Sequence, residues 1–246
     1  GSLLMVVLLT RQLWGERAAL WALLLTAASP GNVAVNLILT IDAPLLFFWS
    51  AALFTFYNQV HCRYHAGRWA IATTVLLGLG LLSKQMMFAF YPLALAYLLI
   101  HRELRGRALN WRLWASWLVS LAFLVPTMIW NARNDWITIS HTQHHFESRP
   151  MTLADTLERI GEFLGSQLGV LSPVTAVAAG ILTIGVILRF RKLDHRARYL
   201  ALFSAPGLVM VCVMLVRQSI NPNWPAVFYV SALMLLGAAM ARADGL

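Results

Sequence analysis

The sequence predicts an all-α protein: a polytopic transmembrane helix bundle of about eight to nine spans, with a long polar loop that carries an interfacial helix. The 246 residues are 59% hydrophobic and 12% charged, with a mean hydropathy of +0.68. A soluble domain is only about 45–50% apolar. Several apolar runs approach the roughly 20 residues that cross about 30 Å of hydrocarbon. These runs do not alternate as the strands of a membrane barrel do, so helices are predicted.

Apolar runs between polar breaks give the order of the membrane segments. The predicted segments are residues 3–10, 17–29, 33–57, 69–83, 86–100, 113–130, 167–189, 199–216 and 225–240. Residues 1–246 are expected to form a single transmembrane domain. No initiator Met or signal-peptide pattern precedes the first segment, so we expect the chain to be a piece of a longer protein.

The basic residues separate the two sides of the predicted bundle. Of the 19 Lys and Arg residues, only five fall in one set of alternate loops: Lys84, Arg133, Arg149, Arg159 and Arg217. Because cytoplasmic loops are rich in Lys and Arg, this sparse set is expected to face outward. The other basic residues lie in short loops rather than on one soluble face, so the net charge of +9 does not indicate a nucleic-acid partner. Membrane lipids are the expected surroundings.

Residues 131–166 form the one long loop, which is predicted to lie on the outer side. It is too polar to cross the membrane and too long for a simple connection, so a functional role is expected. Thr152 and Asp155 are typical of a helix start. Apolar residues follow at helical spacing: Leu153, Leu157, Ile160 and Phe163 or Leu164. This pattern predicts a helix that lies in the membrane interface with its apolar face down.

Two charged residues stand in apolar surroundings on the outer side. Asp42 lies in Thr40-Ile41-Asp42-Ala43-Pro44, where an ionised carboxylate has to be paired, hydrated or used in function. A helix N-cap is the alternative role, because Pro44 suits a first helical turn. Lys84 follows a glycine-containing apolar run, and an anion such as a lipid phosphate is its expected partner. The alternative is a lysine that extends its ammonium group to the interface from a helix end.

A histidine cluster lies within the long loop. His141, His144 and His145 are spaced so that a helix would place them on one face, with Gln143 nearby. Such a face can ligate a divalent metal ion or bind a phosphate, whereas an exposed polar cluster is the alternative. A divalent metal is therefore the candidate cofactor, with His141 and His144 as its candidate ligands.

Aromatic and polar residues open the long loop. Trp130, Asn131, Asp135 and Trp136 can stack on and hydrogen-bond a sugar, and membrane anchoring explains the tryptophans equally well.

The last outer loop, Asn221-Pro222-Asn223-Trp224-Pro225, combines a rigid turn with an aromatic residue. Anchoring is the simplest role for it, and Asn223 and Trp224 are also candidates for substrate binding. The sequence contains no glycine-rich nucleotide loop, no GxSxG and no HExxH motif, which argues against an NTPase, a serine hydrolase and a zincin.

Four motifs, in this order, resemble the bacterial protein-mannosyltransferase-like glycosyltransferases, the family 39 and aminoarabinose-transferase branch of the GT-C superfamily. The motifs are residues 40–49, Leu82-Ser83-Lys84, residues 126–131 with Asp135-Trp136, and residues 223–226. The resemblance spans nearly the whole chain. It implies a GT-C-like bundle in the bacterial inner membrane whose active face is periplasmic. It also implies an enzyme that transfers a sugar from a polyprenyl-phosphate donor to a lipid, glycan or protein acceptor.

The resemblance also implies residue roles. Asp42 matches an acidic position of the active cavity and is the candidate catalytic residue, while Lys84 matches the lysine that contacts the lipid phosphate. Gln143 and the aromatic-loop residues are candidates for the substrate site, and His141 resembles a histidine that helps to hold a metal. The family's principal base is an Asp in a first outer loop that precedes the segment matching residues 3–10. We therefore expect this chain to lack the N-terminal helix and first outer loop of its parent, and to be inactive alone.

Two other classes of protein compete with this interpretation. A secondary transporter also places rare charges inside a helical bundle, but it is expected to show an internal repeat, and the sequence contains none. A non-catalytic subunit for translocation of lipid-linked sugars would not require Asp42 and Lys84 to act together.

Overall fold

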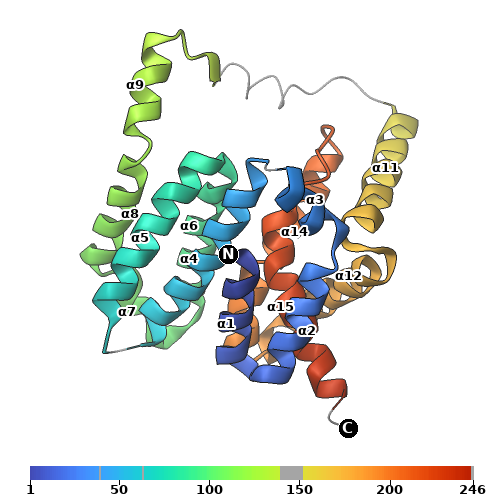
Figure 1. Ribbon diagram of the computed structural model, residues 1–246, viewed down its shortest axis with the longest axis horizontal. Helices are drawn as coiled ribbons and strands as arrows, with labels where there is room; N and C mark the ends of the chain where they lie inside the picture. Colours follow the sequence, from blue (N-terminus) through green and yellow to red (C-terminus); the bar gives the residue numbers. More distant parts are fainter. Residues whose placement is uncertain (39, 63, 139–151, 245–246) are drawn as a thin grey trace.

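A computed structural model of the protein describes residues 1–38, 40–62, 64–138 and 152–244 (Figure 1). All regular structure in these ranges is helical, which confirms the all-α prediction. The α-helices are α1 (Ser2–Trp14), α2 (Glu16–Ala27), α3 (Pro30–Ile38), α4 (Asp42–His61), α5 (Ala66–Ser83), α6 (Phe90–Ile100), α7 (Arg105–Ala108), α8 (Trp111–Ala122), α9 (Val125–Arg133), α11 (Leu153–Leu171), α12 (Pro173–Leu188), α13 (His195–Leu202), α14 (Ala205–Leu215) and α15 (Ala226–Ala243). Short 3₁₀ helices are η1 (Gln85–Ala89), η2 (Arg102–Leu104) and η3 (Phe190–Lys192).

The centre of the bundle is a set of helices that run side by side. α4 packs on α5, α2 packs on α15, and α1 lies between α2 and α4, while α8 covers the outer side of α5 (Figure 1). Gly237 brings α2 and α15 close together, because a Cβ atom there would lie 2.6 Å from the backbone nitrogen of Ala22. Glycine is therefore required where the two helices cross.

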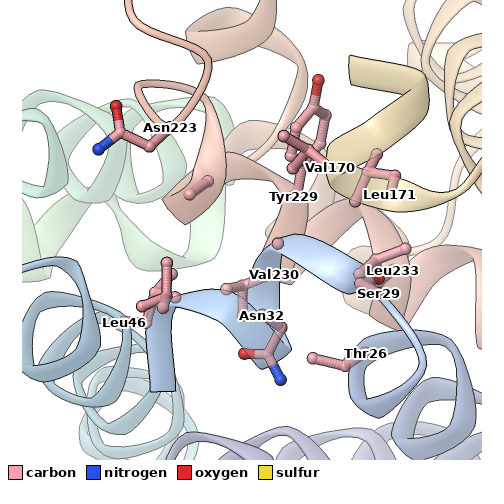
Figure 2. A pocket seen from close by; sticks show the side chains of 13 residues that line it. Thr26, Ser29, Asn32, Leu46, Val170, Leu171, Asn223, Tyr229, Val230 and Leu233 are labelled. Carbon is pink, nitrogen blue, oxygen red and sulfur yellow. The ribbon is translucent and has the colours of Figure 1, made fainter. Parts of the chain in front are cut away.

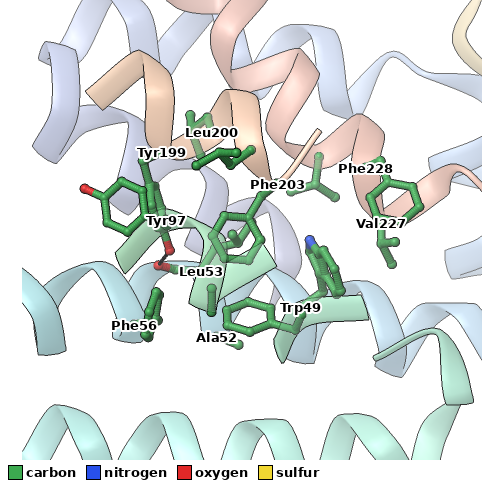
Figure 3. Close-up of a cluster of buried hydrophobic side chains, with 14 of the residues drawn as sticks. Trp49, Ala52, Leu53, Phe56, Tyr97, Tyr199, Leu200, Phe203, Val227 and Phe228 are labelled. Carbon is green, nitrogen blue, oxygen red and sulfur yellow. Dashed lines mark hydrogen bonds between the residues drawn. The ribbon is translucent and has the colours of Figure 1, made fainter. Parts of the chain in front are cut away.

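An aromatic cluster joins four helices in the core (Figure 3). Trp49 of α4 is fully buried and meets Phe90 of α6 edge-on, with 5.3 Å between ring centroids, and Phe228 of α15 at 5.8 Å. Phe203, which follows α13, lies 4.7 Å from Phe90. The hydroxyl of Tyr199 donates a hydrogen bond of 2.7 Å to the carbonyl oxygen of Leu53, so the polar tip of this buried ring is satisfied. These contacts hold the halves of the chain together.

Three helical segments of the described chain are long and apolar enough to cross a membrane: residues 66–83, 195–215 and 226–243. The number rises to five if each of two bent helix pairs is one span, α8 with α9 at 41° and α11 with α12 at 111°. The prediction of an apolar, membrane-type helical protein is thus supported. The predicted number of eight to nine spans is not confirmed.

Two of the predicted segments are broken in the structure. Residues 33–57 divide into α3 and α4, because the helix stops at Ile38 and a new one starts at Asp42. Residues 167–189 are not one straight segment, since Ser172 has φ of 70° and precedes Pro173, which has no amide hydrogen to continue a helix. The helix predicted to begin at Thr152 does so, with a capping box to Asp155, and continues to Leu171.

The connectivity separates two ends of the bundle. Asp42 begins α4, Lys84 follows α5, and Asn223 precedes α15, and together they mark what we call the Asp42 end. The opposite end, called the arginine end, carries Arg11, Arg17, Arg68, Arg102, Arg105, Arg107, Arg196 and Arg242. Several of these side chains bind carbonyl groups near helix ends there, such as Arg196 to Leu13 at 2.6 Å. This gathering of arginines at one end agrees with the distribution of basic residues along the sequence.

Candidate active site

A buried ion pair lies at the Asp42 end of the bundle. The Nζ atom of Lys84 donates a hydrogen bond of 2.7 Å to Oδ1 of Asp42, and the two side chains are only 17% and 4% exposed. Because α4 and α5 form an antiparallel hairpin, the start of one helix meets the end of the other. Each charge would be costly to bury alone, so each stabilises the other in this position.

Asn223 completes the surroundings of the carboxylate. Its Nδ2 atom donates a hydrogen bond of 2.6 Å to Oδ2 of Asp42. A carboxylate only accepts hydrogen bonds, so the amide nitrogen has to face Asp42 and the amide oxygen turns away. That oxygen, Oδ1, is buried and has no hydrogen-bond partner within the described part of the chain. Three distant segments thus converge on one carboxylate.

The position of Lys84 follows from a break in the helix. Lys84 is extended, with φ of −162° and ψ of 141°, and its amide still donates to the carbonyl oxygen of Gly80 at 3.1 Å. The chain then folds back in η1 and buries Met87 beside α5. A Cβ atom on Gly80 would lie 2.8 Å from the sulfur of Met87, so glycine makes room for this return. From this break, the side chain of Lys84 reaches Asp42 of α4.

The geometry decides between roles that the sequence left open. Capping does not explain Asp42, because Ile41 is the N-cap residue of α4 and no side chain caps this helix. Lys84 does not simply extend into the interface, since its ammonium group pairs with Asp42 inside the protein. The expected anion beside Lys84 is thus a carboxylate of the chain itself, and contact with a lipid phosphate stays a prediction.

The loop that carries Asn223 is braced from behind by α11. Gln167 is buried, and its Nε2 donates to the carbonyl oxygen of Pro222 at 3.3 Å. The hydroxyl of Tyr229 donates to Oε1 of Gln167 at 2.9 Å. Sequence reasoning missed Gln167, although a glutamine at the start of a predicted apolar segment is the kind of residue that signals a polar contact.

A mostly apolar cavity of about 80 Å³ adjoins this loop (Figure 2). Its lining includes Ser29, Asn32, Leu46, Leu171 and Tyr229. Asn223 lies at its edge, across the cavity from Thr26. The carboxylamide of Asn223 therefore stands at a boundary between the ion pair and apolar space.

The candidate residues at the end of α9 and just after it lie apart from the ion pair. Figure 1 shows α9 rising beyond the ends of α5 and α8, well apart from α15. Asn131 is 1% exposed, and its Nδ2 donates to the carbonyl oxygen of Thr127 at 3.0 Å while its Oδ1 accepts from the amide of Thr138 at 3.2 Å. Both hydrogen bonds of this side chain therefore stabilise the local backbone. Roles for it in substrate binding stay predictions.

The other candidates differ in exposure. Trp130 and Trp136 are 52% and 45% exposed, and Asp135 and Trp136 have positive φ of 52° and 56°, which marks a tight turn. Trp224 is partly buried against the core, which suits an anchoring role. The structure therefore brings together Asp42, Lys84 and Asn223, and leaves the α9 residues apart.

The predicted metal ligands His141 and His144, together with Gln143, lie outside the described residues. Among the residues that are described, no group of three or more His, Cys, Asp or Glu side chains is arranged to hold a metal ion. Metal binding by the long loop stays a prediction.

Comparison with known proteins connects this geometry to a family. The profile of the family described as dolichyl-phosphate-mannose-protein mannosyltransferase matches residues 2–130, just over half of the chain, including Asp42 and Lys84. Over 213 residues the chain is 25% identical to the lipid A galacturonosyltransferase RgtD of Rhizobium johnstonii (strain DSM 114642 / LMG 32736 / 3841). The aligned region covers 84% of this chain and 42% of that relative. The chain thus spans about two fifths of the length of this curated relative. No solved structure matches it. As the sequence motifs predicted, the chain belongs to the dolichyl-phosphate-mannose-protein mannosyltransferase family, within the GT-C type of glycosyltransferases.

Proposed function

We propose that the chain is part of a membrane glycosyltransferase that transfers a sugar from a polyprenyl-phosphate donor to a lipid, glycan or protein acceptor. The observation that supports this most is the buried pair of Lys84 and Asp42 inside the segment that matches the family. A phosphate leaving group gains negative charge as its bond to the sugar breaks, and a fixed cation stabilises that charge. Lys84 is the cation at this site.

Lys84 is suited to bind a phosphate without leaving Asp42. An ammonium group has three N–H donors, and Asp42 uses one of them. The remaining donors are available to phosphate oxygens. In the proposed reaction the bond between the anomeric carbon and the phosphate oxygen breaks, and a bond from the acceptor oxygen to that carbon forms. The acceptor's proton passes to a carboxylate, and polyprenyl phosphate leaves.

Asp42 is proposed to orient the reacting groups. Its two oxygens offer about four acceptor positions, of which Lys84 and Asn223 use two. An acceptor hydroxyl can therefore still donate to Asp42. Such an arrangement fixes the cation and the acceptor relative to each other before reaction, which is a large part of what enzymes contribute.

The surroundings of the proposed reaction follow from the charge pattern. Arginine-rich ends face the cytoplasm, so the Asp42 end would face the periplasm if the protein lies in a bacterial inner membrane. Lipid A and galacturonic acid, in the name of the relative, are the acceptor and sugar to test first. His141 and His144 remain candidate ligands for a divalent metal that would assist phosphate binding.

A secondary transporter and a non-catalytic translocation subunit are the rival functions. Both are less well supported, because the match to a glycosyltransferase family includes the two residues of the ion pair. Neither rival requires the pair to bind a phosphate specifically.

Native mass spectrometry of the purified chain with polyprenyl phosphate tests the proposal. Wild type is expected to bind the lipid saturably, and Lys84→Ala to lose that binding. Lys192→Ala is the matched control, because Lys192 is an exposed lysine at the arginine end. Binding that is equal in wild type and both variants would contradict a donor site at Lys84.

A further inference from the structure

Asn223 has one half of its amide engaged and the other half without a partner. Nδ2 donates to Asp42 at 2.6 Å, whereas Oδ1 is buried and accepts nothing from the residues that the structure describes. A buried acceptor without a partner is energetically unfavourable, and a ligand or water that donates to it would remove the penalty.

Rotation of the side chain cannot remove this cost. If the amide were flipped, Oδ1 would face the carboxylate of Asp42, and two acceptors would be opposed. The contact with Asp42 therefore fixes the direction of Oδ1. Gln167 holds the neighbouring carbonyl of Pro222, so the loop is also held from behind. Oδ1 is thus a pre-positioned acceptor rather than a loose one.

The chemistry of the missing partner is limited to O–H or N–H groups, because Oδ1 only accepts. An ionised phosphate diester offers only acceptor oxygens, so it cannot be the partner. A sugar linked to that phosphate carries several hydroxyl groups next to it. Asn223 lies one hydrogen bond from Asp42, which itself lies one hydrogen bond from Lys84. A sugar attached to a phosphate at Lys84 would therefore lie within reach of Asn223.

We propose that Asn223 bridges Asp42 and the donor: its Nδ2 holds the carboxylate, and its Oδ1 accepts a hydrogen bond from a hydroxyl group of the phosphate-linked sugar. This inference rests on the proposed function and adds a sugar-recognition role to it. Lys84 then reads the phosphate and Asn223 reads the sugar, so the two halves of the donor are recognised by different residues. Asp42 links the two recognition groups.

The test compares two lipids on the same chain. Binding of polyprenyl phosphate and of polyprenyl-phosphate mannose or galacturonate is measured for wild type, Asn223→Ala and Asn223→Ser. Asn221→Ala is the matched control, because Asn221 is an exposed asparagine of the same loop. Asn223→Ser keeps a hydroxyl group near Asp42 and places no acceptor at the position of Oδ1, so it serves as the test if the alanine variant does not fold.

Wild type is expected to bind a sugar-bearing lipid more tightly than the bare one. Both Asn223 variants are expected to lose about tenfold in affinity for that sugar-bearing lipid, and less than about threefold for the bare lipid. Asn221→Ala should change neither affinity. A donor that lacks the contacted hydroxyl should bind wild type about tenfold more weakly and bind Asn223→Ser no worse than the intact donor.

Three results would overturn the inference without contradicting the proposed function. Equal losses for both lipids would show that Asn223 acts only through Asp42. An unchanged preference for the sugar in both variants would mean that water satisfies Oδ1, as would a wild type with no preference. In each case Lys84-dependent binding of the bare lipid would leave the proposed function standing. If wild type bound neither lipid, the proposed function would fail and this inference with it.

Discussion

Lys84 and Asp42 are 42 residues apart in the sequence, yet their charged atoms lie 2.7 Å apart at the open end of the α4–α5 hairpin. The pair is held mostly out of water, with side chains 17% and 4% exposed. A cation after the end of α5 and an anion in the first turn of α4 also complement the dipoles of the two helices. The pair is therefore both a structural closure of the hairpin and the charged centre of the candidate site.

Removing one partner of this pair should cost more than removing both. Lys84→Met leaves the carboxylate buried and uncompensated, which typically costs about 3–5 kcal/mol. In Lys84→Met combined with Asp42→Asn, no buried charge remains, so we expect a large part of that stability to return. Thermal unfolding of the purified protein in detergent measures both effects. If the double variant lost as much stability as Lys84→Met and Asp42→Asn lose together as separate variants, the two residues would not interact.

The sequence predicted the participants in this pair but not their pairing. Asp42 and Lys84 could be recognised because each is a rare charge in apolar surroundings. Their contact depends on the antiparallel packing of α4 and α5, and no local pattern in the sequence states that. Asn223 was expected near substrate, whereas its bond to Asp42 depends on where the loop before α15 lies.

Breaks within helices are a feature that hydropathy alone did not predict. Residues 167–189 read as one apolar run, but the chain turns by 111° at Ser172 because a proline follows and φ becomes positive. A search for apolar length ignores such a local signal. The start at Thr152 was predicted correctly because a capping box is local, with both hydrogen bonds contained within four residues.

Gly237 should be intolerant even of alanine. The added Cβ would lie 2.6 Å from the backbone nitrogen of Ala22 and 2.9 Å from its Cα, and backbone atoms cannot move aside as a side chain can. We expect Gly237→Ala to lower stability by about 1–3 kcal/mol, as overpacking does, through separation of α2 and α15. The melting temperature in detergent measures the loss.

Gly180 provides the control for this substitution. It lies within α12, and a Cβ atom there would meet nothing within 4 Å. Gly180→Ala should be neutral or stabilise by up to about 1 kcal/mol, because alanine favours a helix. Equal melting temperatures for the two variants would contradict close packing at Gly237.

Gln167 should affect the site through the loop it braces. Gln167→Leu keeps a side chain of similar size but removes the bond to Pro222 and leaves the hydroxyl of Tyr229 without its acceptor. We expect a loss of about 1–3 kcal/mol in stability and a weaker preference for the sugar-bearing lipid. Gln167→Leu combined with Tyr229→Phe also removes the unpaired hydroxyl. This double variant should recover stability but not the preference for the sugar-bearing lipid. If the preference survives in both variants, the loop does not depend on α11.

Asp42→Asn separates binding from transfer. Asparagine has nearly the same shape, and its oxygen can still accept from Lys84, so bare polyprenyl phosphate should bind within a few-fold of wild type. The amide lacks the charge that orients an acceptor hydroxyl toward the base, so transfer should fall by a factor of about 10²–10⁴, as when an acid–base step loses its support. The measurement is sugar transfer in vesicles that contain the full-length protein.

The control is Glu103→Gln, which removes an exposed carboxylate at the arginine end and should leave transfer unchanged. Because both variants lose one negative charge, a general effect of charge on the vesicles would appear in both. Transfer that survives in Asp42→Asn would remove Asp42 from the reaction while leaving Lys84 as a donor site. Loss of both transfer and donor binding would instead mean that the carboxylate matters because it holds Lys84 in place.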